Sequence, residues 1–203
     1  MNIRELAIPD SFELTPIQRR DDRGLFLEWY RFDEFEQVIG HPMHLRQANT
    51  SVSRKGVVRG IHFAEIPIGQ AKYVTVPHGA VIDFVIDIRV GSNTYGNWDS
   101  VLLDDVDRRA VYIAEGLGHA FVALTEGATV SYLVTDTYSP TKEHGVNPLD
   151  PEIGLRFPAA AGEPLVSPRD LEAPTLAECR DRGLLPSWED ARGLYRTLNQ
   201  TGR

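Results

Sequence analysis

The 203-residue chain contains a single cysteine, Cys179, and no long apolar run. One cysteine excludes both an intrachain disulfide framework and a zinc cage built from cysteines. A membrane span would need roughly 20 consecutive apolar residues, and the N-terminal residues lack the basic and apolar regions of a signal peptide. We therefore expect a cytoplasmic protein with no membrane partner.

The formal net charge of −8 disfavours a nucleic-acid partner, because an acidic chain repels phosphate backbones. Four cations that are spread along the sequence could still form a local pocket for one phosphorylated ligand: Arg23, Arg59, Lys72 and Arg169. The hydrophobic fraction of 42% and the charged fraction of 25% are those of an ordinary globular protein. The length predicts one domain with a short appendage.

Short strand-like segments follow one another through the middle of the chain. In Ala80–Arg89, one face carries isoleucines and a phenylalanine, while the other carries Asp83 and Asp87 among valines. This strand should therefore have one packed face and one polar face that lines a cavity. The other predicted strands are Leu25–Tyr30, Leu45–Val52, Val57–Phe63, Ala71–Val76, Ser100–Leu103, Ala110–Ile113, Ala120–Leu124 and Thr129–Thr135.

Many short strands without intervening helices predict an all-β fold, a sandwich or barrel of the jelly-roll kind. Helix signals occur only near the ends of the chain. Phe32–Ile39 has helical periodicity before Gly40, and Thr175 with Glu178 forms a capping box before a helix that Gly183 closes. Ser187–Leu198 could form one more helix. We expect a single domain over residues 1–203, with a helical appendage from about residue 174.

Polar groups occur where the pattern predicts buried strands. Arg59 and His62 interrupt the apolar run Val57–Phe63, Lys72 follows on the next segment, and His119 lies in a glycine-rich stretch. Burying a charge or an unpaired imidazole is costly. Any one of these residues could be a satisfied core or surface group, but together they favour a small-molecule site.

These segments belong to a longer ordered pattern. From Arg23 to about Pro174 the chain resembles the cupin-type dTDP-4-keto-6-deoxysugar epimerases, the family that includes dTDP-4-dehydrorhamnose 3,5-epimerase. The matching motifs are Asp22-Arg23-Gly24-Leu25-Phe26-Leu27-Glu28, Gln47-Ala48-Asn49-Thr50-Ser51, Arg59-Gly60-Ile61-His62-Phe63, Gly69-Gln70-Ala71-Lys72, Glu115-Gly116-Leu117-Gly118-His119-Ala120-Phe121 and residues 132–140.

Three positions depart from the rhamnose enzymes. Ala64 stands where those enzymes usually carry a glutamine, Leu133 replaces a basic residue, and Thr137 replaces an aromatic one. The chain is therefore more similar to relatives that tailor deoxysugars for secondary metabolites. The departures leave open whether C3 alone or both C3 and C5 are epimerised.

The resemblance implies a reaction without a metal or redox cofactor. Inverting a carbon beside a ketone needs a base on one face, an acid on the other, and stabilisation of the enolate. His62 matches the base, Tyr132 the acid, and Lys72 the cation near the enolate oxygen. Asp170 matches the carboxylate that orients His62, although Asp83 is an alternative from the sequence alone.

The resemblance also implies a dTDP-linked 4-keto-6-deoxysugar as ligand and a homodimer with exchanged N-terminal strands. Arg59 and His119 match residues near the reacting sugar and its phosphates, and Tyr138 matches an aromatic that stacks on thymine. Polar contacts to the nucleotide match Gln47, Asn49, Glu143 and Arg169, while Arg23, Phe26 and Glu28 match residues that reach the ligand from the neighbouring subunit.

Three alternative functions remain open on the sequence. A metal-dependent cupin, either a dioxygenase or a sugar isomerase, could use His62, Glu65 and His119 as ligands, although the usual His-x-His motif is missing. A noncatalytic sugar-nucleotide binding protein would not need both an acid and a base. A keto-isomerase would use the same base with a different second proton donor.

Overall fold

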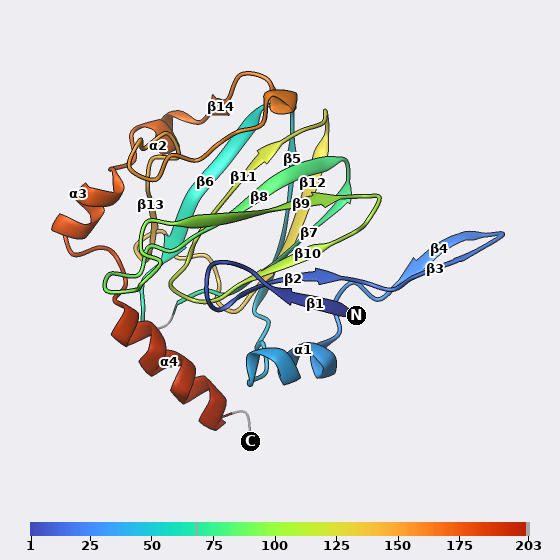
Figure 1. The fold of residues 1–203 in the computed structure, drawn as a ribbon, viewed down its shortest axis with the longest axis horizontal. Helices are drawn as coiled ribbons and strands as arrows, with labels where there is room; N and C mark the ends of the chain where they lie inside the picture. Colours follow the sequence, from blue (N-terminus) through green and yellow to red (C-terminus); the bar gives the residue numbers. More distant parts are fainter. Residues whose placement is uncertain (68, 202–203) are drawn as a thin grey trace.

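The computed structural model describes residues 1–67 and 69–201, and two β-sheets that face each other dominate it (Figure 1). The first sheet has the strand order β1-β2-β10-β7-β12-β5. All its neighbouring strands are antiparallel. Its strands are β1 (Asn2–Glu5), β2 (Ser11–Thr15), β10 (Ala110–Ile113), β7 (Lys72–His78), β12 (Ala128–Val134) and β5 (Gln47–Ser53).

The second sheet has the order β13-β6-β11-β8-β9, with the short strand β14 parallel to β6. Its strands are β13 (Glu143–Gly145), β6 (Val57–Ala64), β11 (Gly118–Ala123), β8 (Ala80–Ile86), β9 (Trp98–Asp104) and β14 (Leu165–Val166). Within the described residues, no strand pairing closes the two sheets into a barrel. The expected all-β architecture is confirmed, in its sandwich form.

Two hydrophobic clusters hold this architecture together. One lies between the sheets and joins Val74 and Val111 of the first sheet to Val85 and Phe121 of the second. The other lies behind the second sheet, where Phe84 and Ile86 pack against the chain after β13, including Val146 and Cys179. Successive residues of β8 therefore enter different cores, as the period-two pattern predicts.

Several helices cover the edges of the sandwich. They are α1 (Phe32–Ile39), α2 (Pro168–Leu171), α3 (Leu176–Asp181) and α4 (Trp188–Thr201), together with a 3-10 turn at Ala159–Ala161. The predicted capping box of Thr175 and Glu178 opens α3. In the described part of the chain, no helix is long and apolar enough to span a membrane. The division into one domain with an appendage stays a prediction.

The structure corrects several predicted boundaries. The strand expected over residues 80–89 ends at Ile86, because the Asp87 carboxylate accepts hydrogen bonds from the backbone and side chain of Arg89 and turns the chain. The strand expected over 25–30 is shorter, β4 (Gly24–Leu27), and pairs with β3 (Gln18–Asp21). This hairpin projects away from the sandwich (Figure 1).

Five strands were not predicted: β1, β2, β3, β13 and β14. They have five residues or fewer, and most of their side chains are polar or exposed. Such segments carry little hydrophobic periodicity, so pairing with a longer neighbour determines their conformation.

Candidate active site

A cavity of 470 Å³ opens between the two sheets. Both sheets supply polar side chains to it: Lys72 and Tyr132 from the first, and His62 and His119 from the second. The full lining is Ser51, Arg54, Val57, Val58, Arg59, His62, Lys72, His119, Phe121, Tyr132, Leu165, Val166, Ser167 and Asp170.

An irregularity in β6 lets Arg59 and His62 line the same cavity. Residues three apart point to opposite faces of a regular strand. Here the pairing with β11 shifts register at Gly60, which has φ +127°. A Cβ atom at this position would lie 2.5 Å from the Cβ of Ala120, so only glycine fits.

His62 is hydrogen bonded to Asp170, with 2.8 Å between His62 Nε2 and Asp170 Oδ1. Burial acts to raise the pKa of the Asp170 carboxyl, but His62, Ser167 and Arg169 outweigh it and hold that pKa below its usual value. An ionised carboxylate can only accept hydrogen bonds. Nε2–H therefore donates to Asp170, and Nδ1 is left to accept a proton.

Lys72 belongs to a second charged group deeper in the site. Asp83, the alternative partner for His62, instead lies 2.8 Å from His119 through its Oδ2 atom. Burial lowers the pKa of the Lys72 ammonium, while Glu143 and Asp83 oppose that shift. Burial likewise raises the pKa of Asp83, against the influence of His119 and Lys72. Burial therefore disfavours the charge on Lys72, and negative charge that develops beside the ammonium would be stabilised by it.

Tyr132 enters the cavity from β12, in the sheet opposite His62. Burial is the main cause that raises the pKa of its hydroxyl, with Glu143 adding to the effect and Arg59 opposing it. The hydroxyl is thus protonated at neutral pH and can act as a proton donor. Arg59 is held beside it by a 3.1 Å hydrogen bond from Nε to Ser53 Oγ.

A separate polar group gathers four of the predicted nucleotide contacts. The Gln47 side chain donates to Asn49 and accepts from the backbone N–H of Tyr138. Glu143 accepts from Gln70 and from the backbone of Ser139. The Tyr138 side chain is exposed. Arg169 lies on α2 next to Asp170 and helps to lower the pKa of that carboxyl.

The other three predicted contacts lie on or just after the projecting hairpin. Arg23 forms an ion pair with Asp21, and Glu28 lies 3.9 Å from Arg31. Phe26 is 65% exposed. In the described residues of one chain, these side chains are not part of the cavity lining.

Four further residues line the cavity that the sequence did not single out as site residues: Ser51, Arg54, Phe121 and Ser167. The alternation of β5, which places residues 47, 49, 51 and 53 on one face, was the available signal for Ser51. No three histidine, cysteine, aspartate or glutamate side chains in the described residues are grouped closely enough to hold a metal ion. Glu65, a ligand of the alternative metal site, is instead hydrogen bonded to His144.

Comparison with known proteins gives consistent matches. The family model described as dTDP-4-dehydrorhamnose 3,5-epimerase matches residues 5–178. A dTDP-4-dehydrorhamnose 3-epimerase from Streptomyces niveus is 57% identical over 188 residues, covering 93% of this chain and 90% of that protein.

Two solved structures share the fold closely. NovW, a 4-keto-6-deoxy sugar epimerase from the novobiocin gene cluster of Streptomyces spheroides, has a TM-score of 0.91 and 56% identity, covering 94% of this chain and 95% of its own. ChmJ, a 3'-monoepimerase from Streptomyces bikiniensis in complex with dTDP-quinovose, has a TM-score of 0.93 and 43% identity. The match covers 96% of this chain and 98% of the ChmJ chain. With a family match over most of its length and relatives this similar, the chain belongs to the dTDP-4-dehydrorhamnose 3,5-epimerase family.

Proposed function

We propose that this chain epimerises a dTDP-linked 4-keto-6-deoxyhexose at C3, or at both C3 and C5, in deoxysugar biosynthesis for a secondary metabolite. The observation that carries the proposal is the His62–Asp170 pair on one side of the cavity and the protonated Tyr132 on the other. A base and an acid from opposite sheets suit a reaction that removes a proton from one face of a carbon and returns it to the other. NovW and ChmJ support the substrate class and the setting.

In this mechanism, Nδ1 of His62 removes the proton from the carbon beside the ketone, while Asp170 stabilises the imidazolium that results. Negative charge develops on the C4 oxygen, and Lys72 supplies the preorganised donor for it. A donor of this kind lowers a barrier by about 3 kcal/mol. Tyr132 then protonates the opposite face of the carbon. Arg59 and His119 would hold the sugar between these groups.

Incubation with dTDP-4-keto-6-deoxyglucose in deuterium oxide tests this reaction. NMR should show deuterium at C3; label at C5 as well would identify a double epimerase. His62→Ala should lose the incorporation, whereas His78→Ala, which changes an exposed histidine beside Asp105, should keep it. Wild-type exchange in the His62 variant would rule out His62 as the base.

A homodimer with exchanged N-terminal strands would complete the site. Arg23, Phe26 and Glu28 would reach a neighbouring cavity from the projecting hairpin, and Tyr138 with Phe26 would enclose the thymine. The exposure of Ile17, Phe26 and Trp29 supports this, because three large apolar side chains in one region are typical of an interface. Gln47, Asn49 and Glu143, together with Arg169 on α2, would make the polar contacts to the nucleotide.

Size-exclusion chromatography with light scattering tests the dimer, and dTDP titration tests the shared site. Phe26→Ala should weaken dTDP binding in a dimer, and a monomer that binds dTDP equally well would refute the exchange. Val106→Ala, which truncates an exposed side chain on a different loop, is the control. The cytoplasmic location and the independence from cofactors stay predictions.

A further inference from the structure

Glu115 is a buried carboxylate that the proposed mechanism does not use. It lies in the turn between β10 and β11 and is 3% exposed. Its Oε1 atom accepts a 3.3 Å hydrogen bond from the Thr135 hydroxyl, and that hydroxyl accepts a 2.9 Å hydrogen bond from the backbone N–H of Ala71. Among the residues that the structure describes, its buried Oε2 atom has no hydrogen-bond partner.

These contacts meet at the ends of the two strands that carry the catalytic groups of the first sheet. Ala71 precedes Lys72, and Thr135 follows Val134, which is the register partner of Lys72. The backbone N–H of Thr135 also donates to the Ala71 carbonyl, extending the ladder by one pair. Tyr132 lies three residues before Thr135. Glu115 therefore lies outside the cavity and stabilises the last backbone pair of this ladder, that of Ala71 and Thr135.

The packing leaves Glu115 little freedom to move. A Cβ atom on Gly69 would lie 2.6 Å from the Cβ of Glu115 and 3.5 Å from a methyl group of Leu194 in α4. Gly69 is thus enclosed between the Glu115 side chain and the C-terminal helix. A displaced Glu115 would have to displace Gly69 too.

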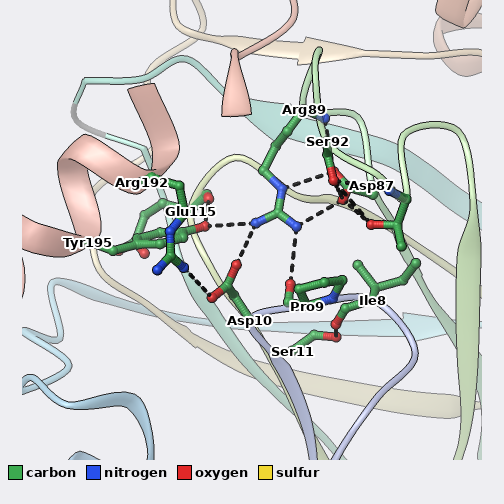
Figure 2. Close-up of polar contacts among 11 residues, drawn as sticks. Ile8, Pro9, Asp10, Ser11, Asp87, Arg89, Ser92, Glu115, Arg192 and Tyr195 are labelled. Carbon is green, nitrogen blue, oxygen red and sulfur yellow. Dashed lines mark hydrogen bonds and ion pairs between the residues drawn. The ribbon is translucent and has the colours of Figure 1, made fainter. Parts of the chain in front are cut away.

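The main chain of Glu115 is tied to α4 through a buried polar network (Figure 2). The Tyr195 hydroxyl donates to the Glu115 carbonyl and accepts a 3.3 Å hydrogen bond from Arg89. Arg89, fully buried, is also bound by Asp87 and by Asp10 at 2.8 Å. The helix α4 lies beyond residue 178, where the family match ends.

Among the described residues, Glu115 forms no ion pair; the titratable groups that face it are Tyr112 and Tyr195. Burial raises the pKa of the Glu115 carboxyl to about 7, against the lowering influence of the nearby backbone N–H groups of Glu115 and Ala71 and of the Thr135 hydroxyl. The side chain therefore acts through hydrogen bonds and shape, and glutamine is its close mimic.

We infer that Glu115 is a positioning residue, which couples α4 to the strand ends that carry Lys72 and Tyr132. Its effect on turnover rests on the proposed epimerase function. Its effect on the strand ends does not, so the two can be tested separately.

Hydrogen exchange measured by mass spectrometry tests the coupling without substrate. Thr135→Val and Glu115→Ala should raise amide exchange ~10-fold in peptides over residues 71–76 and 129–135. Exchange over β9 should not change. Glu115→Gln should keep wild-type exchange in both peptides and in β9, because glutamine preserves the hydrogen-bond acceptor for Thr135. Thr129→Val, which removes a β12 hydroxyl that donates to the Gly127 carbonyl in the turn before the strand, is the matched control.

Steady-state kinetics test the catalytic consequence. Thr135→Val and Glu115→Ala should lower kcat ~10-fold with KM within twofold, because misplaced catalytic groups affect the chemical step. Tyr195→Phe should also lower kcat and raise amide exchange, but by less than Glu115→Ala does. Glu115→Gln should keep most of the activity that Glu115→Ala loses. These four variants separate positioning from general destabilisation, since Thr135→Val and Glu115→Gln keep the side-chain volume.

Three results would count against the inference, two against the positioning role and one against the coupling to α4. One is a folded Thr135→Val variant with wild-type exchange at both strand ends and wild-type kcat. The other is a Glu115→Gln variant as impaired as Glu115→Ala. If Tyr195→Phe alone had no effect, the coupling to α4 would be wrong. A wild-type protein that lacks epimerase activity would refute the proposed function, while the exchange experiment would still test the coupling.

Discussion

The hydrogen bond between His62 and Asp170 determines which ring nitrogen of the histidine can accept a proton. Asp170 sits at the first turn of α2, where its backbone N–H donates to Ser167, and it comes from a point 108 residues further along the chain than His62. The His62 side chain is 40% exposed while that of Asp170 is 9% exposed. The base thus faces the cavity, and its partner is shielded behind it.

Replacing Asp170 by asparagine should impair proton removal. Asparagine keeps the shape but removes the charge that stabilises the imidazolium, so we expect kcat to fall ~10²-fold. Initial rates of deuterium incorporation at C3 measure this. Glu172→Gln, at an exposed position after α2, is the control and should behave as wild type. Equal rates for Asp170→Asn and wild type would show that this pair has no role in the chemical step.

Tyr132→Phe should separate proton removal from inversion. Without the hydroxyl, His62 can still remove a proton and return a deuteron to the same face, so exchange should exceed net epimerisation by ~10-fold or more. The two rates are compared in one NMR time course. Tyr95→Phe, which removes a hydroxyl outside the cavity, should leave their ratio unchanged. Equal loss of both rates would place Tyr132 in the first step.

At the scale of elements, β6 shows where sequence patterns are informative and where they fail. The apolar run from Val57 to Phe63 predicts the strand, and the polar residues Arg59 and His62 predict a site. A regular strand would nevertheless send these two side chains to opposite faces. Only the register shift at Gly60 brings them together, and at that point Gly60 packs closely against Ala120 in the neighbouring strand.

Gly60→Ala should therefore damage both stability and the site. An added methyl group meets the backbone and side chain of Ala120, and the φ angle of +127° is one that side chains rarely adopt. We expect the free energy of unfolding to fall by at least ~2 kcal/mol, measured by urea denaturation. Gly162→Ala, with a positive φ but open space around it, isolates the backbone contribution and should cost ~1 kcal/mol. Equal losses in both variants would show that the contact with Ala120 is unimportant.

For the whole molecule, local patterns predicted the all-β class, the central strands and the helices α1, α3 and α4. They did not predict which distant side chains meet. Asp170 was the expected partner of His62, with Asp83 left open as an alternative; the structure pairs Asp83 with His119 because β8 and β11 are neighbours. Short polar strands such as β13 were missed because long-range pairing, rather than their own composition, holds them in the sheet.

The buried network around Glu115 links the stability of the whole fold to pH. The pKa of Glu115 is raised from 4.5 to about 7 by burial, so the folded state binds one more proton than the unfolded state between these values. The free energy of unfolding must then decrease as pH rises through this window and level off above it. Glu115→Gln cannot ionise and lacks this contribution. Urea denaturation should show that the free energy of unfolding of the variant, relative to that of wild type, rises by up to about 3 kcal/mol between pH 4.5 and pH 8. A stability difference that stays constant across this range would mean that Glu115 is ionised in the folded protein throughout, with a partner that compensates its charge.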